Sequence, residues 1–516
     1  MYDVVIVGYG PTGMLAAILL GRAGHRVAVL ERYTTLYNLP RVGIVHDDVL
    51  RMFQEIGCLE RIAPATLFLP LYELANKGRV LLSNRVETMA THGHPEMTSI
   101  YQPAFEAELD AIAKSLPTVD VFQGESVVAL TQDEDGVTAT SENQSGVRRE
   151  VCGRYLIGSD GGNSFIRRAL GIGYEDLGFD QNWLVIDGRA KRPQRADLPL
   201  LRQFCEPEQP GMTMQMGPHH RRWSFMIFPE ESAEDAVRPE NVWRRLARPE
   251  GGTADDFELI RVVAYKFQSL MAERWRVGRV ILAGDAAHQM PPFLAQGMCS
   301  GFRDACNIAW KLDLVLRGHA GGELLETYEA EREPNARATI VESMKVGQNV
   351  NERDPEKVRL RDEALLALQA AKERGEAPRQ LIAFRVPGFD AGFVSRTSVG
   401  AGDAFPQARV SGTSGEGLFD DVIGRGFLIV ARTGDPATAL PPGARDFWRS
   451  IGGGYVRFGT PDAIDADGTY TRWMDDYGCD VAVKRPDNYL FGTGRTLGHL
   501  PALIAELKQQ LGTRPA

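Results

Sequence analysis

Cysteine is scarce in this chain, and long apolar runs are absent. The six cysteines are scattered over 516 residues and form no Cys-x-x-Cys pair, so we expect neither a disulfide framework nor a zinc site. The apolar run Met14–Leu20 covers seven residues, whereas a membrane-spanning helix needs about 20. The opening residues, Met1-Tyr2-Asp3, lack the basic segment of a signal peptide. We therefore expect a cytoplasmic protein that has no membrane partner and no metal.

Positive charge is in deficit as well. Lysine and arginine number 58 against 68 aspartate and glutamate residues, which gives a net charge of −10 and argues against a nucleic-acid partner. Glycine, by contrast, is abundant at 54 residues, as expected where the backbone approaches a ligand closely. The length corresponds to about three domains at roughly 100–200 residues each.

The start of the chain predicts a strand–helix–strand unit. Residues 3–7 are a β-branched apolar run, which is typical of a buried parallel strand. The segment Gly8-Tyr-Gly-Pro-Thr-Gly13 follows directly and leads into a helix expected over Pro11–Ala23. A second apolar strand, Arg26–Leu30, ends at Glu31. A G-x-G-x-x-G segment in this position is typical of a dinucleotide-binding turn.

Each residue type in this turn has a physical role. Gly8 permits the tight turn, Gly10 lets the backbone approach a pyrophosphate, and Gly13 lets the helix pack closely on the strand. Pro11 suits a first helical position, and the helix N-terminus offers N–H groups and a partial positive charge to phosphates. Glu31 is placed to bind a ribose hydroxyl. From these residues alone the nucleotide could be FAD or NAD.

Short antiparallel strands are predicted in the middle of the chain, for example at Gln203–Glu206 and Trp223–Pro229. A buried strand returns at Val280–Ala283, and the Gly- and Ser-rich residues 386–417 precede a separate C-terminal segment. The middle strands carry a methionine-rich stripe that could be hydrophobic core or the wall of a substrate pocket. Its members are Met212, Met214, Met216, Trp223, Phe225, Met226 and Phe228.

Two later motifs resemble those of the class A flavoprotein aromatic hydroxylases. Leu156–Ser164, followed by Arg167 and Arg168, resembles the Asp-Gly motif of that family. Val280–Pro292, continued by Gln296–Leu312, resembles its second flavin motif. With the N-terminal turn, the motifs occur in the order that the family has, and the resemblance covers roughly residues 3–345.

Within this family, the sequence is most similar to the 3-(3-hydroxyphenyl)propionate hydroxylases. The segments that carry this closer resemblance are Pro40-Arg41, Asp47–Arg51, Tyr101-Gln-Pro103 and Trp310-Lys-Leu312. The late segment Val483–Tyr489 resembles the thioredoxin-like C-terminal domain of the family.

The resemblance implies an α/β fold like that of p-hydroxybenzoate hydroxylase. A Rossmann-like FAD-binding domain would carry an inserted β-sheet substrate domain and be followed by a thioredoxin-like C-terminal domain. Because that last domain lacks Cys-x-x-Cys, we expect it to serve packing or oligomerisation, with a homodimer as one candidate assembly. The expected boundaries are 1–178 and 277–385 for the FAD-binding domain with its helical segment, 179–276 with a contribution from 73–99 for the middle domain, 386–417 for a linker, and 418–516 for the C-terminal domain.

The resemblance also implies an activity. NADH or NADPH would reduce non-covalently bound FAD, and O2 would then be used to hydroxylate a phenolic ring through a flavin C4a-hydroperoxide. The substrate would be a small phenol or, alternatively, a larger aromatic such as a polyketide or a hydroxylated heteroaromatic. A non-catalytic FAD-binding protein is a further alternative, because it would keep the nucleotide motifs without turnover.

Specific site residues follow from the same resemblance. Asp285 would bind the ribityl chain, and Pro291-Pro292 would border the flavin with carbonyls free to accept a phenol. His288 and His46 are candidate bases, each with a purely structural alternative. The catalytic candidates are thus Pro291, Pro292, His288 and His46, and the cofactor-binding candidates are Gly8, Gly10, Pro11, Thr12, Gly13, Glu31, Arg32, Arg41, Gln102, Asp160, Asp285, Pro292, Gln296, Gly297 and Met298.

The chain departs from the family pattern at two positions. Ala295 stands where relatives usually have glycine, and Cys299 stands where they usually have asparagine. The first change adds a methyl group to a crowded loop, and the second removes an amide donor and acceptor.

Overall fold

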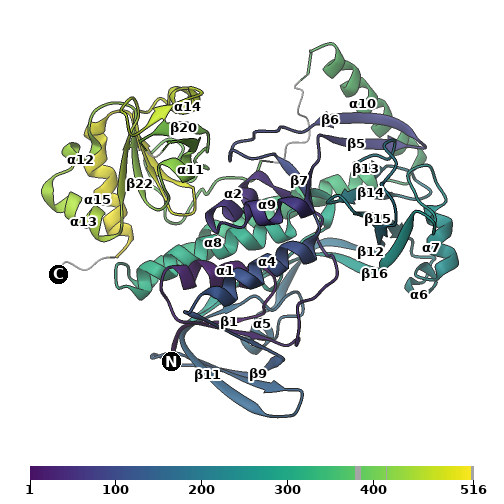
Figure 1. Ribbon diagram of the computed structural model, residues 1–516, viewed down its shortest axis with the longest axis horizontal. Helices are drawn as coiled ribbons and strands as arrows, with labels where there is room; N and C mark the ends of the chain where they lie inside the picture. The colour runs from purple at the N-terminus through teal and green to yellow at the C-terminus, as the bar shows by residue number, and fades with distance from the viewer. Residues whose placement is uncertain (378–384, 414, 513–516) are drawn as a thin grey trace.

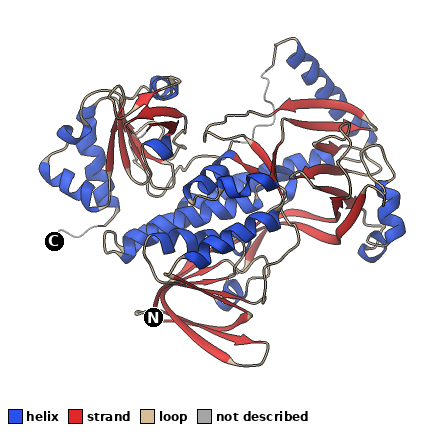
Figure 2. Cartoon of the chain, in the orientation of Figure 1, coloured by secondary structure: helices blue, strands red, loops and turns tan. Residues whose placement is uncertain are grey.

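The computed structural model describes residues 1–377, 385–413 and 415–512. Figure 1 shows a central body of helices on a first sheet, a second sheet on one side of it, and a C-terminal domain on the other. In Figure 2 the long helices fill the centre and the strands lie around them. The α/β class expected from the sequence is confirmed. No helix in the described part of the chain has the length and apolar character needed to cross a membrane.

The first sheet places the nucleotide motifs along one edge. Its order is β17-β18-β11-β1-β2-β8, and β9 and β10 extend it beyond β11. Strands β18, β11, β1, β2 and β8 are parallel, so the turns after them meet at a shared carboxyl edge. The bounds are β1 (Tyr2–Val7), β2 (Val27–Glu31), β8 (Val119–Gln123), β9 (Glu125–Gln132), β10 (Val137–Asn143), β11 (Arg148–Gly158), β17 (Arg276–Val277) and β18 (Val280–Leu282).

Long helices cover this sheet and lead away from its carboxyl edge. Helix α1 follows the N-terminal turn and packs against α8 and α4. Both α1 and α8 are buried over most of their length. The sequence of α1 is accordingly apolar, whereas α8 also buries polar side chains such as Arg303, Asp304 and Lys311. The helices of the central body, long and short, are α1 (Pro11–Arg22), α2 (Asp47–Glu55), α3 (Leu59–Ile62), α4 (Gln102–Ser115), α5 (Phe165–Ala169), α8 (Gly297–Leu316) and α9 (Glu326–Val350). Helix α10 (Pro355–Glu373) packs instead on β6 (Arg79–Arg85) of the second sheet.

The second sheet has the order β19-β16-β12-β15-β14-β13-β5-β6. Its pairs are antiparallel except β13 with β5. A small third sheet has the order β3-β7-β4. The bounds are β3 (Ile44–His46), β4 (Thr66–Phe68), β5 (Leu71–Asn76), β6 (Arg79–Arg85), β7 (Met97–Ile100), β12 (Tyr174–Ala190), β13 (Leu201–Phe204), β14 (Gly211–Met216), β15 (His220–Ile227), β16 (Phe257–Ala272) and β19 (His288–Gln289), with α6 (Ala233–Ala236) and α7 (Pro239–Leu246) on the outer side.

Strand alternation divides the methionine-rich stripe between two faces. Trp223 and Phe225 pack with Val242 and Leu246 of α7 in a separate core. Met212 and Met214 face the opposite side and line a cavity. The stripe is therefore core on one face and cavity wall on the other.

The C-terminal domain is built on the sheet β23-β22-β25-β26. Strands β22 and β23 are parallel, and the other pairs are antiparallel, which is the thioredoxin-like arrangement. Two buried ion pairs join the domain to the central body, Arg51 with Asp420 and Glu331 with Arg485. The elements are β20 (Arg409–Gly412), β21 (Gly415–Leu418), α11 (Phe419–Val422), β22 (Leu428–Ala431), α12 (Pro436–Ala439), α13 (Pro442–Ser450), β23 (Gly454–Arg457), β24 (Ile464–Asp465), α14 (Thr469–Tyr477), β25 (Val481–Lys484), β26 (Leu490–Gly494) and α15 (Leu500–Gln510).

Residues 386–417, expected as a linker, contain ordered structure in their described part. Phe389, Phe393 and Phe405 are buried, and β20 already belongs to the C-terminal domain through its pairing with β24. The glycine- and serine-rich composition of this segment could not show whether it packs against the protein or forms a loose linker.

Candidate active site

A cavity of about 590 Å³ runs from the carboxyl edge of the first sheet to the inner face of the second sheet. The predicted site residues fall into two groups with respect to it. The cavity is lined by Gly10, Pro11, Thr12, Arg32, Arg41, His46, Gln102, Asp285, Pro292, Gly297 and Met298, whereas Gly8, Gly13, Glu31, Asp160, His288, Pro291 and Gln296 lie outside its lining.

The three glycines of the N-terminal turn have different surroundings. Gly8 has a φ of +101°, and a Cβ there would lie 2.4 Å from the carbonyl oxygen of Ser159. A Cβ on Gly13 would lie 2.1 Å from the carbonyl oxygen of Gly8. A Cβ on Gly10 would meet no atom within 4 Å, because it would project into the cavity. Gly8 and Gly13 are thus needed for packing, and Gly10 keeps space open for a ligand.

Two helix N-termini meet this cavity. Neither α1, which begins at Pro11, nor α8, which begins at Gly297, has a side-chain hydrogen bond at its N-cap. The first-turn residues of both helices line the cavity. Uncapped N–H groups and the helix dipole favour anionic groups at such positions.

Glu31 fixes the backbone around the turn. Its carboxylate accepts hydrogen bonds from Tyr9 N at 2.7 Å and from Tyr33 N at 2.9 Å. The next residue, Arg32, lines the cavity, with its guanidinium over the ring of Tyr33. Glu31 therefore lies beside the nucleotide end of the cavity while it holds two loops together.

Asp285 presents a carboxylate to the cavity. It follows β18 in a short 3₁₀ turn, and no described residue donates a hydrogen bond to its side chain. The residue is exposed where it lines the cavity, and desolvation by the surrounding protein raises its pKa although His288 and Arg41 act in the opposite direction. A carboxylate that lines a cavity without a protein donor can accept hydrogen bonds from a ligand that carries hydroxyl groups.

Gln102 and Arg41 are brought together by the loop before β3. The side-chain oxygen of Gln102 accepts from Arg41 N at 2.9 Å and from Val42 N at 2.6 Å. Glu106 accepts from the Gln102 amide at 2.6 Å and pairs with the Arg41 guanidinium at 2.8 Å. Gln102 thus shapes the cavity wall through the backbone.

The opposite side of this loop is held by side chains that the sequence analysis did not identify. Arg222 donates to the carbonyl oxygens of Arg41 at 2.6 Å and Pro40 at 3.1 Å. Arg261 also donates to Pro40, at 2.6 Å. Asp187, which is fully buried, pairs with Arg222 at 2.6 Å. The sequence did offer one signal for this contact, because the pair Arg221-Arg222 stands inside an otherwise apolar strand.

Asp160 and Gln296 lie among protein groups at the start of two helices and do not line the cavity. Asp160 accepts from the hydroxyl of Ser164 and from the backbone N–H groups of Phe165 and Ile166, at the start of α5. Its neighbour Gly161 reaches the cavity. Gln296 is the buried N-cap residue of α8, and its side-chain oxygen has no partner among the described residues.

The carbonyls of the proline pair are already engaged, contrary to the expectation that they are free. Pro291 O accepts from the hydroxyl of Ser343 at 2.7 Å, and Pro292 O accepts from Ala295 N at 2.9 Å. Ala295 has a φ of +55°, a left-handed conformation that glycine adopts at lower cost. This explains why glycine is usual at this position.

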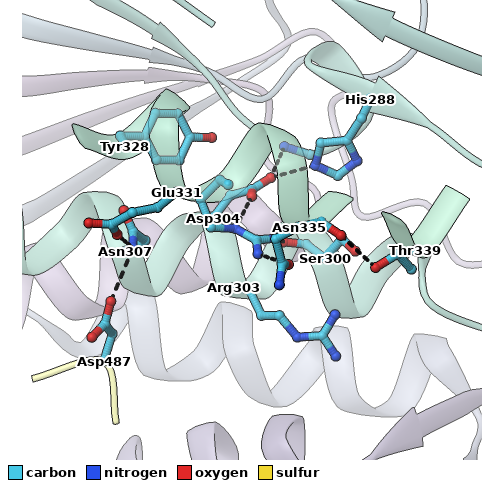
Figure 3. Close-up of polar contacts among 12 residues, drawn as sticks. His288, Ser300, Arg303, Asp304, Asn307, Tyr328, Glu331, Asn335, Thr339 and Asp487 are labelled. Atoms are coloured by element: carbon cyan, nitrogen blue, oxygen red, sulfur yellow. Dashed lines mark hydrogen bonds and ion pairs between the residues drawn. The ribbon is translucent and has the colours of Figure 1, made fainter. Parts of the chain in front are cut away.

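His288 does not reach the cavity, and the geometry therefore argues against it as a base. Its Nε2 lies 2.7 Å from the Asp304 carboxylate, and the residue is 1% exposed. Asp304 also accepts from Arg332 at 2.9 Å, and Figure 3 shows this buried network between α8 and α9. Burial opposes ionisation of Asp304, but His288 and Arg332 outweigh it and lower its pKa to about 2. His288 thus belongs to the packing of the helices.

His46 does line the cavity. Its Nε2 lies 3.2 Å from the carbonyl oxygen of Leu294, to which it can donate. Burial lowers the pKa of His46, although Asp48 and Asp47 raise it. A neutral imidazole with one nitrogen directed to Leu294 leaves the other nitrogen as a proton acceptor.

A dinucleotide-binding turn whose cavity continues onto the face of an antiparallel sheet is the arrangement of a dinucleotide-dependent oxidoreductase. Comparison with known proteins gives the family. A model described as FAD binding domain matches residues 1–343, and one described as HcaD C-terminal domain matches residues 402–510. The chain belongs to the class A flavoprotein aromatic hydroxylases, and it is an FAD-dependent enzyme.

Individual relatives match over almost the whole chain. A probable NADH-specific resorcinol 4-hydroxylase of Rhodococcus jostii is 40% identical and aligns over 100% of this chain and 96% of its own length. A 3-(3-hydroxy-phenyl)propionate/3-hydroxycinnamic acid hydroxylase of Mycolicibacterium smegmatis is 32% identical over 95% of this chain and 90% of its own. The crystal structure of the flavin-dependent monooxygenase PieE in complex with FAD and substrate has a TM-score of 0.83 at 22% identity and covers 99% of both chains. This last likeness shows the shared fold.

Proposed function

We propose that this enzyme hydroxylates a small uncharged phenol of the size of resorcinol, with NADH as the reductant and in the cytoplasm. The name of the Rhodococcus relative supports this choice. The observation that carries it is the charge balance of the cavity wall, because a hydroxyphenylpropionate would need an available cation for its carboxylate.

The cations at the cavity are committed to other groups. Four of the five have a carboxylate partner, with Arg222 and Arg261 sharing Asp187, and the fifth, Arg32, lies next to Glu31 at the nucleotide end. The sheet end is lined mainly by apolar side chains such as Trp183, Leu201, Met212 and Met214. The four pairs are Arg41 with Glu106 at 2.8 Å, Arg222 with Asp187 at 2.6 Å, Arg261 with Asp187 at 3.7 Å, and Lys266 with Asp180 at 2.7 Å.

The residues at the other end fit FAD. The open space at Gly10 and the N-terminus of α1 would accept the pyrophosphate, and Asp285 would accept hydrogen bonds from the ribityl hydroxyls. The first turn of α8, at Gly297 and Met298, would place N–H groups beside the flavin ring. Bound FAD supplies the activation of O2 after reduction by NADH.

The chain itself would position and deprotonate the phenol. His46 would accept the hydroxyl proton at the imidazole nitrogen that does not face Leu294, which makes the ring more electron-rich. Phe293, Leu294 and Ala295 line the cavity beside His46 and would exclude water from the reacting ring.

The test is product analysis on the FAD-loaded enzyme. NADH consumption, hydroxylated product and hydrogen peroxide are measured with resorcinol, with 3-(3-hydroxyphenyl)propionate and with a polycyclic phenol. We expect product to match NADH consumption with resorcinol, and little product with the other two. A higher ratio of product to NADH with the carboxylate substrate would contradict the proposal.

A further inference from the structure

A buried side-chain amide in the cavity wall, that of Gln203, has no hydrogen-bond partner among the described residues. Gln203 lies on β13, faces the cavity and is 4% exposed. Its side-chain oxygen is buried without a partner, and no hydrogen bond from its amide nitrogen to a described residue is present. An unpaired buried amide is costly in a folded protein, so the position points to a ligand that completes it.

A second polar group lies in the same row of the sheet. Gln203 pairs with Met212 on β14, and Met212 pairs with Ser224 on β15. Paired positions project to the same face of a sheet, and all three residues line the cavity. Ser224 is 4% exposed, and no described residue bonds to its hydroxyl. Met212 is thus flanked by two unpartnered polar side chains.

The spacing and chemistry of this row suit a dihydroxybenzene. Neighbouring strands are about 4.8 Å apart, so Gln203 and Ser224 stand about 10 Å apart across the row. A benzene ring can lie on the thioether of Met212 between them. An amide and a hydroxyl each both donate and accept, which matches an uncharged ring hydroxyl.

We propose that Gln203, Met212 and Ser224 form a subsite that selects a ring with two hydroxyl groups, Gln203 and Ser224 hydrogen-bonding to them while Met212 supports the ring. This rests on the proposed function in that the ligand is the phenolic substrate. The subsite makes Gln203 a specificity-determining residue. A site built to bond a hydroxyl discriminates strongly against a ligand that lacks it.

The test is equilibrium binding without NADH, so that no turnover occurs. Titration calorimetry on the FAD-loaded protein compares resorcinol with phenol, which lacks the second hydroxyl. We expect resorcinol to bind roughly tenfold more tightly than phenol. Gln203→Leu should abolish most of this preference, and Ser224→Ala, a smaller change, should reduce it in the same direction.

A matched control lies on the other face of the same sheet. The amide of Gln215 on β14 donates to Pro218 O at 3.3 Å and does not line the cavity, so Gln215→Leu should leave the preference unchanged. If Gln203→Leu and Ser224→Ala both retain the wild-type preference, or weaken both ligands equally, the subsite is wrong.

Product analysis separates this inference from the proposed function. If the preference for resorcinol depends on Gln203 but no hydroxylated product forms, the proposed function fails and the subsite stands. If resorcinol is hydroxylated and its binding does not depend on Gln203 or Ser224, only the subsite fails.

Discussion

The two ends of the cavity are built from different parts of the chain. The nucleotide end is formed by backbone, with Gly10 and two uncapped helix N-termini from one sheet edge. The sheet end is formed by side chains of Gln203, Met212 and Arg222 on separate strands. Backbone geometry fixes which residue types are allowed at the first end, whereas the second end can change its side chains without altering the fold. In the function proposed above, this arrangement separates cofactor binding from substrate choice.

The sharpest test of the backbone end is Gly10→Val. The new side chain would enter the ligand space without meeting protein atoms, so the protein should fold and bind FAD at least about a hundredfold more weakly. Gly13→Val is the matched control, because its Cβ would lie 2.1 Å from Gly8 O, and this variant should fail to fold. Thermal unfolding and the flavin absorbance per chain measure both effects. Stoichiometric FAD in Gly10→Val would show that the pyrophosphate binds elsewhere.

At the sheet end, Arg222→Met and Arg221→Met separate positioning from stability. Loss of Arg222 leaves the buried Asp187 with Arg261 at 3.7 Å, which should cost about 3–5 kcal/mol, and it frees the loop at Pro40. We expect more hydrogen peroxide per NADH consumed by Arg222→Met. Arg221 bonds instead to Gln194 and Pro199, away from the cavity.

Arg221→Met should therefore lower the melting temperature and leave the peroxide ratio at the wild-type value. Equal peroxide ratios in the two variants would mean that the hydrogen bonds from Arg222 to the Pro40–Arg41 loop do not position the substrate.

Substitution of Asp285 tests how far the nucleotide end of the cavity depends on a side chain. Because desolvation raises its pKa in the folded protein, the FAD-free protein loses stability as pH rises from the unfolded pKa through the folded one. Asp285→Asn should raise the melting temperature of the FAD-free protein at pH 7, and the gain should vanish below about pH 4. FAD binding should weaken by less than in Gly10→Val. A lower melting temperature at pH 7 would contradict this description of Asp285.

The same contrast explains which residues could be predicted from the sequence. Gly8, Gly10 and Gly13 were predictable because a turn between strand and helix imposes fixed spacings. Asp285 was predictable through resemblance, and it reaches the cavity. The surroundings of His288 could not be predicted, because its partner Asp304 lies on α8 and comes close to it only in the folded protein.

The sheet end could not be derived from local sequence. Gln203 and Arg222 face the cavity because of strand register, and Asp187 and Arg261 come from two further strands of the same sheet. Period-two alternation gives two possible faces for each strand, and only the assembled sheet decides between them. The methionine-rich stripe showed the same ambiguity, since its two faces have different roles.

The central claim is that one cavity holds FAD at its backbone end and an uncharged phenol at its side-chain end. A crystal structure of the FAD-loaded enzyme with resorcinol tests it most directly. We predict the pyrophosphate at Gly10 and the N-terminus of α1, with the phenol on Met212 between Gln203 and Ser224. FAD outside this turn, or resorcinol bound away from the inner face of the second sheet, would contradict the account.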